Sequence, residues 1–339
     1  MKSNRFSLTP CLLLIALGLW SGQAHAQLAG LVHDPVAGEL RVAEIDSANG
    51  TFTTGTGAVT DCCQFTSGLI STNSTTDQFY ALGTFTGGAL VDQLGVFTLG
   101  YDGTTVSASI VADTPESVLE YDEQLGVLIS MKTVDLATGM QLIGIDPTSG
   151  AVTPFPTNNV DCCEIVTGVS ALDSAARRLY FAGRQAGEAT WSVYVADLNS
   201  GVAVPFEVLP SGAPGFMGLS PNGTTLEVMM QSDLLASSQL IGIDLAGGGS
   251  TVLAEYSDSQ CCLLTPGQTP SNSQDGESWW LAGSNTGLED ALMAMTRNGL
   301  SGLTRIQALD PVPGVHLLAV VVDGNTVSLD ILFSDRFQL

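Results

Sequence analysis

The 339-residue sequence is acidic: 34 Asp and Glu oppose 10 Lys and Arg, for a formal net charge of −24. Such a charge makes nucleic acid and anionic membrane surfaces poor partners. Because 45% of the residues are hydrophobic and only 13% are charged, the chain can build a large core.

Residues 1–26 predict a secretory signal peptide. Lys2 and Arg5 form a basic start, an apolar run follows, and small residues precede the expected cut after Ala26. Removing this segment takes away two basic residues and no acid, so the net charge becomes −26. No stretch approaches the roughly 20 apolar residues of a spanning helix. We therefore expect one domain, residues 27–339, that is periplasmic or secreted.

Three vicinal cysteine pairs mark an internal repeat. They are Cys62-Cys63, Cys162-Cys163 and Cys261-Cys262, spaced by 100 and then 99 residues. In each unit an Ile-Asp pair and a turn precede the cysteines, as in RVAEIDSANG, QLIGIDPTSG and QLIGIDLAGG. Another shared segment follows them: QFYALG, RLYFAG and SWWLAG. Periods of this kind are typical of arrays and propellers.

Each unit of the repeat divides into two runs of four strands. Segments such as RLYFAGRQ, WSVYVADLNSG and VAVPFEVL carry Val, Tyr and Phe between turn residues. Four strands in about 50 residues form one propeller blade. The sequence therefore predicts an all-β, six-bladed β-propeller built from three two-blade repeats. GLEDALMAMTRNG, from Gly287, has a helical pattern, but its alignment with WSVYVADLNSG predicts a strand.

The two ends of the chain are expected to close the ring in a composite blade. HLLAVVVDGNTVSLDILF, from His316, supplies two strands, and ELRVAEIDSANGTFTTG, from Glu39, supplies two more. Such a join removes the free sheet edges. LAGLVHD, from Leu28, also resembles a strand. Either that blade has five strands, or one of these candidates lies outside the sheet.

These features resemble the exported bacterial β-propellers with degenerate blades, those of the YVTN, TolB and NHL types. The resemblance rests on strand pairs such as Leu179-Tyr180 and on turns such as IDPTSG and LSPNG, and it spans most of residues 27–339. It implies the fold and carries no catalytic residue onto this chain, because the superfamily shares its shape across many activities.

The cysteine pairs fall where the outer strand of one blade leads to the inner strand of the next, on the face that opens the central channel. Pairs in alternate blades would stand on the order of 15 Å apart, whereas a disulfide requires Cα atoms within about 7 Å. Six cysteines in an exported chain favour disulfides. We therefore expect three vicinal disulfides, each within its own pair.

Three roles stay open for these pairs. They stiffen turns, or they line a ligand site at the channel mouth together with Asp61 and Asp161, or reduced thiols gather a soft metal such as Cu(I). The acids directly before two of the pairs, with no Lys or Arg within five residues, disfavour thiolates. A similar disulfide lies beside the quinone of PQQ-dependent propeller dehydrogenases, but this chain lacks their repeated Trp motif. No cofactor is expected.

Two further groups have a structural and a functional interpretation. His33 and His316 fall in the closing blade, as structural histidines or as a metal or acid–base pair. Arg177, Arg178 and Arg184 form a basic cluster, expected on a solvated strand edge or, alternatively, docked to an acidic group.

The remaining candidates favour structural explanations. The Asp-rich turns at 46–50, 146–150 and 197–201 lack the alternating acids of a calcium loop and are expected to be hairpin turns. Trp279 and Trp280 share one strand, and core packing is expected for both.

The predicted function is that of a binding module. The sequence has no Ser-His-Asp order, Gly-x-Ser-x-Gly, P-loop or HExxH motif. We expect an unknown small molecule or protein to bind at the channel mouth beside the cysteine pairs. The alternatives are a propeller enzyme of the lactonase or lyase kind, using acids at the same mouth, and a soft-metal binder.

Overall fold

A computed structural model describes most of the chain after the predicted signal peptide. The described segments are 27–46, 51–135, 139–156, 164–220, 222–231 and 237–257, and beyond them the strands at 263–264, 271–272, 277–283, 290–296, 304–308 and 316–322.

Most of the described strands form antiparallel sheets of four consecutive strands. They are β4 (Gln64–Asn73), β5 (Gln78–Thr84), β6 (Leu94–Gly100) and β7 (Val106–Ile110); β8 (Glu116–Asp122), β9 (Val127–Asp135), β10 (Gly139–Ile145) and β11 (Val152–Pro154); β12 (Glu164–Asp173), β13 (Arg178–Arg184), β14 (Ser192–Asp197) and β15 (Ala203–Val208); and β16 (Ala213–Leu219), β17 (Thr225–Gln231), β18 (Ser237–Asp244) and β19 (Ser250–Ser257). A further sheet contains β20 (Leu263–Leu264), β22 (Glu277–Gly283), β23 (Asp290–Thr296) and β24 (Thr304–Ala308), with β21 (Ser271–Asn272) beside β22.

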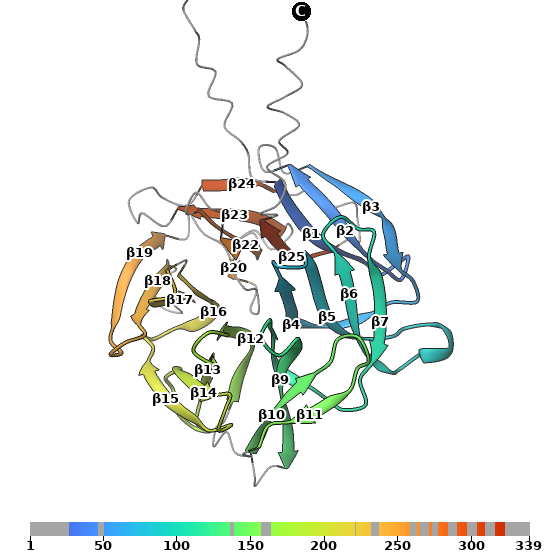
Figure 1. Cartoon of the computed structure of the whole chain (residues 1–339). Coiled ribbons are helices and arrows are strands. Elements are labelled where there is room, and N and C mark those ends of the chain that lie inside the picture. The colour runs from blue at the N-terminus through green and yellow to red at the C-terminus, as the bar shows by residue number, and fades with distance from the viewer. Residues whose placement is uncertain are drawn as a thin grey trace, which may run out of the picture.

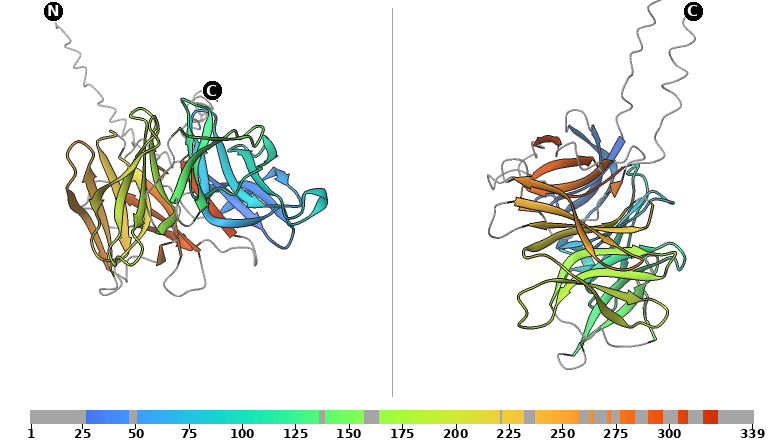
Figure 2. Two further views of the ribbon diagram at one scale, coloured as in Figure 1. Left: turned by 90° about the horizontal axis from the view of Figure 1, so that it is seen from below. Right: turned by 90° about the vertical axis from the view of Figure 1, so that its left-hand side faces the viewer.

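The sheets surround a common centre, as in a β-propeller. Figure 1 shows β4, β12 and β16 near the centre, and β7, β15 and β19 at the rim. Neighbouring inner strands contact each other, β4 with β8, β8 with β12 and β12 with β16. Figure 2 shows the sheets side by side from two further directions. The all-β propeller fold expected from the sequence is confirmed.

The two ends of the chain share one sheet, in the order β25 (His316–Val322), β1 (Gln27–Asp34), β2 (Glu39–Asp46), β3 (Phe52–Val59). The composite sheet is therefore present, but the expected share of two strands from the N-terminal end is wrong, because three come from it. The second strand expected from the C-terminal end lies outside the described residues. LAGLVHD forms β1 and takes the second place, between β2 and β25. LAGLVHD therefore does not lie outside the sheet.

Helix is scarce, as expected. Among the described residues the one helical element is a short 3-10 turn, η1 (Gly88–Leu90). The segment with the helical pattern forms β23, which pairs with β22 and β24. Pairing on both sides has overridden the local propensity.

Each apolar cluster of the core lies between two neighbouring sheets. In β5, Phe79 packs toward the composite sheet with Leu40 and Val42. Its neighbour Tyr80 packs the other way, with Leu128 of β9. Consecutive side chains point to opposite faces of a strand. A strand in a sheet that packs between two other sheets therefore buries the side chains on both of its faces. QFYALG and RLYFAG are therefore continuous apolar runs, not alternating ones.

The inner strands are irregular at matching places in the repeat. The register of β4 on β5 shifts between Phe65 and Ile70, and that of β12 on β13 shifts between Ile165 and Ser170. Gly168 lies in the second bulge with a φ of 74°, a conformation that favours glycine. The bulges curve these strands where they approach the centre.

The Asp-rich turns are hairpin turns where they are described. Asp146 accepts hydrogen bonds from the amide N of Thr148 at 2.8 Å and of Ser149 at 3.4 Å. Asp197 accepts them from Asn199 at 2.8 Å and from Ser200 at 2.9 Å. The carboxylates therefore cap their own turns. Most of the turn at 46–50 lies outside the described residues.

The arginine cluster does not lie on a strand edge, so that expectation is wrong. Arg178 lies on β13, which pairs on both sides. Arg177 instead reaches across the seam between two sheets and forms an ion pair with Asp122, whose side chain is fully buried. Arg184 pairs with Glu164 at 2.6 Å and stacks 4.3 Å from the ring of Trp191. Arg177 and Arg184 therefore form ion pairs with acids of this same chain.

We predict that Arg177→Ala destabilises the fold, because it leaves the Asp122 carboxylate buried without its cation. The expected loss in the free energy of unfolding is about 3 kcal/mol, measured by urea denaturation. The exposed neighbour provides a control, since Arg178→Ala is expected to change it by less than about 0.5 kcal/mol. An equal loss of unfolding free energy in the two variants would contradict the expected contribution of the buried Arg177–Asp122 ion pair to stability.

Candidate functional site

A pocket of about 510 Å³ opens at the seam between the composite sheet and the β4–β7 sheet. Its lining comes from the end of β1 and the turn after it, the β3–β4 link, the start of β4, the loop after β5, and β25. The lining residues are His33, Pro35, Cys62, Cys63, Gln64, Phe65, Thr86 and Leu318.

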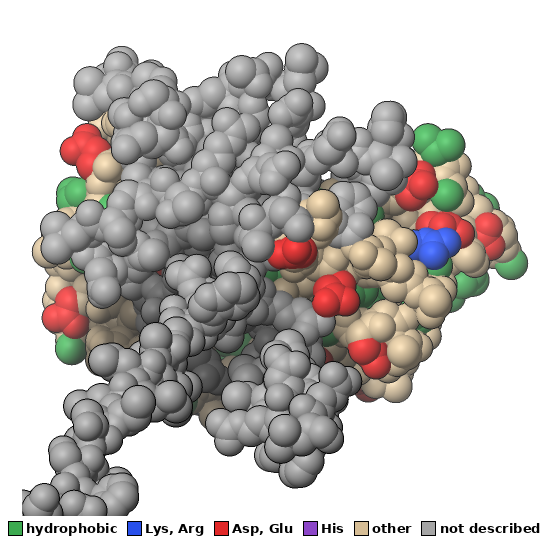
Figure 3. Space-filling view, turned by 90° about the horizontal axis from the view of Figure 1, so that it is seen from above, with side chains coloured by type: hydrophobic (Ala, Val, Ile, Leu, Met, Phe, Trp, Pro, Cys, Tyr) green, Lys and Arg blue, Asp and Glu red, His purple; other side chains and the backbone are tan. Residues whose placement is uncertain are grey.

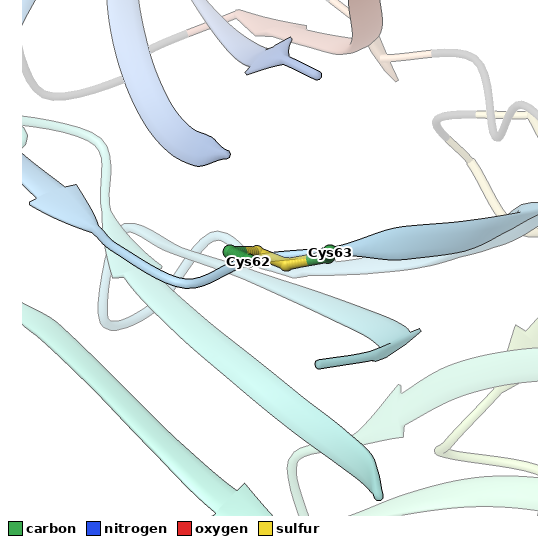
Figure 4. The surroundings of a disulfide bond; sticks show 2 residues. All are labelled: Cys62 and Cys63. Carbon is green, nitrogen blue, oxygen red and sulfur yellow. A yellow bond between two sulfur atoms is a disulfide. The ribbon is translucent and has the colours of Figure 1, made fainter. Parts of the chain in front are cut away.

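The first cysteine pair lies at the predicted link between an outer and an inner strand. Figure 4 shows Cys62 and Cys63 directly before β4. Their sulfur atoms are joined in a disulfide, with the Cα atoms 3.2 Å apart. Both residues are buried, at 1% and 4% exposure, and belong to the apolar cluster between the two sheets. The pair thus contacts the core and also lines the pocket.

Two loops hold this link in place. The amide N of Cys62 donates to the carbonyl O of Gly38 at 3.0 Å, and the amide N of Thr86 donates to that of Asp61 at 3.2 Å. A Cβ atom at Gly87 would stand 2.9 Å from Oδ1 of Asp61, so the loop after β5 lies close to this side chain. The carboxylate is exposed and is not among the pocket-lining groups.

Phe65 supplies an aromatic wall that is fixed on several sides. Its ring meets that of His33 edge-on, with centroids 5.0 Å apart and an interplanar angle of 83°. Phe97 lies on another side, at 6.0 Å. A Cβ atom at Gly83 would come within 2.9 Å of the Phe65 ring, so the ring lies directly over that backbone. These contacts on several sides fix the position of the ring.

The two candidate histidines are brought together by the ring closure. His33 on β1 stands directly opposite His316 on β25 in the strand register. Only the side chain of His33 is described, and it is 8% exposed at the pocket. Among the described residues, no group of three or more His, Cys, Asp or Glu could hold a metal ion.

The other predicted site residues cannot be compared with this pocket. Asp161, Cys162, Cys163, Cys261 and Cys262 lie outside the described residues. Their grouping about one axis stays a prediction. Trp279 and Trp280 lie on β22, but their side chains are likewise not described.

Sequence reasoning missed several of the lining residues. Gln64 and Phe65 directly follow the cysteine pair, so adjacency alone would have indicated them. Thr86 and Leu318 carry no such signal. The loop after β5 and strand β25 are distant from the cysteine pair in the sequence and come close to it only in the folded chain.

Among the described acids, Glu120 has the one pKa that is shifted far from its ordinary value. It lies on the inner strand β8 at 7% exposure and accepts a hydrogen bond from the Ser170 hydroxyl of β12 at 2.7 Å. Burial raises the pKa of Glu120 to about 7, and the Ser170 hydrogen bond opposes this only in part. Altered pKa values cluster at active sites, although structural networks also produce them. Glu120 does not line the described pocket. We therefore interpret its hydrogen bond with Ser170 as a structural contact between two sheets.

Comparisons with known proteins support the fold. No protein-family model matches the sequence, and no curated protein matches it. The TolB protein from Acinetobacter baumannii aligns with a TM-score of 0.57 and 11% identity, over 87% of this chain and 66% of the TolB chain. One chain of a nidogen/laminin complex aligns with a TM-score of 0.56 and 9% identity, over 88% of this chain and 99% of its own. The inferred resemblance to such propellers is thus confirmed as a likeness of fold.

The described part of the chain contains no helix that is long and apolar enough to cross a membrane. This finding adds no information on residues 1–26, which are not described.

We predict that Glu120→Gln changes how stability depends on pH. The pKa of Glu120 is raised from 4.5 to about 7, so the folded protein binds the extra proton between these values. The stability linked to that proton is complete below pH 4.5 and is lost as the pH rises through about 7, by roughly 3 kcal/mol.

The variant cannot ionise at this position, so it should gain stability relative to the wild type as the pH rises from 5 to 8. Urea denaturation across this range measures the difference. Glu116→Gln, an exposed change on the same strand, is the control and should leave the difference flat. A constant difference for Glu120→Gln would show that the carboxylate is not desolvated in solution.

Proposed function

We propose that this protein is an exported binding module that holds a small molecule in the pocket beside Cys62 and Cys63. In this proposal it is a six-bladed propeller of three two-blade repeats, and it acts in the periplasm or after secretion. The pocket carries the proposal. Its volume of about 510 Å³ falls within the range of roughly 300–1,000 Å³ that is typical of small-molecule sites.

The lining favours binding over catalysis. None of the described lining residues is an acid, and His33 is the one lining group that can exchange a proton near neutral pH. A lactonase or lyase of the expected kind would use acids at this site. A soft-metal site is disfavoured by the disulfide, because a metal requires thiolates.

The binding proposal includes three vicinal disulfides, one in each repeat. Cys62 and Cys63 support it by their bond, and the other two pairs share the repeat sequence around them. Each disulfide would connect two adjacent residues of one interstrand link. No disulfide would connect segments that are distant in the sequence.

We predict that unfolded but unreduced mature protein takes up no iodoacetamide at its six cysteines, and takes up six equivalents after reduction. Intact mass measures both. A Glu-specific digest without reduction should release the three cysteine segments separately, because no bond joins them. Six labelled thiols before reduction, or cross-linked segments, would contradict the vicinal pairing.

We predict that Thr86→Trp closes the pocket. Thr86 is exposed at its rim, so the larger side chain has room to fold over the opening without disturbing the core. A library of neutral, anionic and cationic small molecules is screened by thermal shift against the wild type. At least one compound should stabilise it and lose at least about tenfold in affinity in the variant.

Thr148→Trp provides a matched control. Thr148 is also exposed, in the turn between β10 and β11, and does not line the pocket. Ligands of the pocket should bind this variant as they bind the wild type. If no compound of any charge distinguishes the two variants, the pocket is not a binding site and the proposed function fails.

A further inference from the structure

We infer that the pocket selects a neutral amphiphile, with a flat apolar part against the disulfide and an uncharged polar end at the opening. This inference rests on the proposed function and specifies the ligand class of the same site. The burial of the lining residues, the chemistry of their side chains and the charge around them carry it.

The floor of the pocket is apolar and buried. Cys62 and Cys63 are almost completely buried, and their disulfide carries no charge and no hydrogen-bond donor. Phe65 and Leu318 are partly buried and belong to the same apolar cluster. An apolar ring or short chain placed here would leave water and contact carbon and sulfur atoms of the floor. Removing apolar surface from water in this way stabilises binding.

The rim is exposed and holds the uncharged polar groups. Pro35, Gln64 and Thr86 are all exposed. The amide of Gln64 both donates and accepts hydrogen bonds, and the Thr86 hydroxyl does the same. A hydroxyl, carbonyl or amide at the outer end of the ligand would meet these groups. The pocket is therefore graded from an apolar floor to a polar rim.

An anionic group would find one candidate partner among the described lining residues, the imidazole of His33. No Lys or Arg is among them, and acids flank the pocket in sequence, with Asp34 directly before Pro35 and Asp61 directly before Cys62. The net charge of −24 adds repulsion. On the face drawn in Figure 3, acidic side chains are scattered over the described part, and the basic side chain that is visible lies beside acids.

A cationic group gains little as well. The overall charge attracts cations to the surface, but none of the described lining residues is a carboxylate. The exposed carboxylate of Asp61 lies close to Gly87 and Gly88, outside the lining. Moving a charge from water to the apolar floor without a partner is strongly unfavourable. The neutral form of a ligand is therefore favoured over either ion.

Two matched pairs of compounds test this inference. N-phenyl-1-naphthylamine and 8-anilinonaphthalene-1-sulfonate share their rings and differ by one sulfonate. The neutral probe should bind the wild-type protein with a fluorescence increase, at least about tenfold more tightly than the sulfonate. As competitors, 1-naphthalenemethanol should displace this probe at least about tenfold more effectively than protonated 1-naphthylmethylamine.

The rim variants assign the binding to this pocket. Thr86→Trp should weaken the neutral probe by at least about tenfold, whereas Thr148→Trp should leave its affinity within about twofold. If the sulfonate or the ammonium compound binds as tightly and is equally sensitive to Thr86→Trp, selection for neutral ligands is wrong, while the pocket still binds small molecules. If no probe responds to Thr86→Trp, this inference fails, and the library screen decides separately whether the proposed function fails with it.

Discussion

The pairing of β25 with β1 is the constraint on which the rest of the structure depends. It runs from Leu28 opposite Val322 to His33 opposite His316, and it places the first described strand inside a sheet instead of at an edge. A sheet edge left open would expose unpaired backbone groups. The same pairing brings Leu318 next to the β3–β4 link, so one wall of the pocket depends on the closure of the ring.

Burial on both faces of the sheets explains where polar groups are tolerated. Between the β8–β11 and β12–β15 sheets, Glu120 meets Ser170 and Asp122 meets Arg177. A buried polar group without a partner is strongly unfavourable. Each of these groups therefore has a partner on the neighbouring sheet, and the polar contacts help to fix how adjacent sheets are aligned.

The sequence predicted what depends on local pattern and on the repeat. Hairpin turns capped by Asp146 and Asp197, and an inner strand that follows each cysteine pair, require only short-range information. The order of the composite sheet could not be predicted, since LAGLVHD and ELRVAEID are equally strand-like and only the pairing with β25 distinguishes them. The ion pair of Arg177 could not be predicted either, because its partner Asp122 lies 55 residues away in the sequence.

A structural role and the proposed ligand-binding role of the Cys62-Cys63 disulfide are compatible, because the pair has two sides. One side packs with the cluster that includes Phe85 and Phe97, and the other lines the pocket. Bonding the two sulfurs removes two thiols that would otherwise donate or ionise, and leaves a compact apolar surface. A group that stiffens the link between two sheets therefore also provides a fixed, uncharged floor, and the rigidity that serves the fold is the same rigidity that a preorganised site requires.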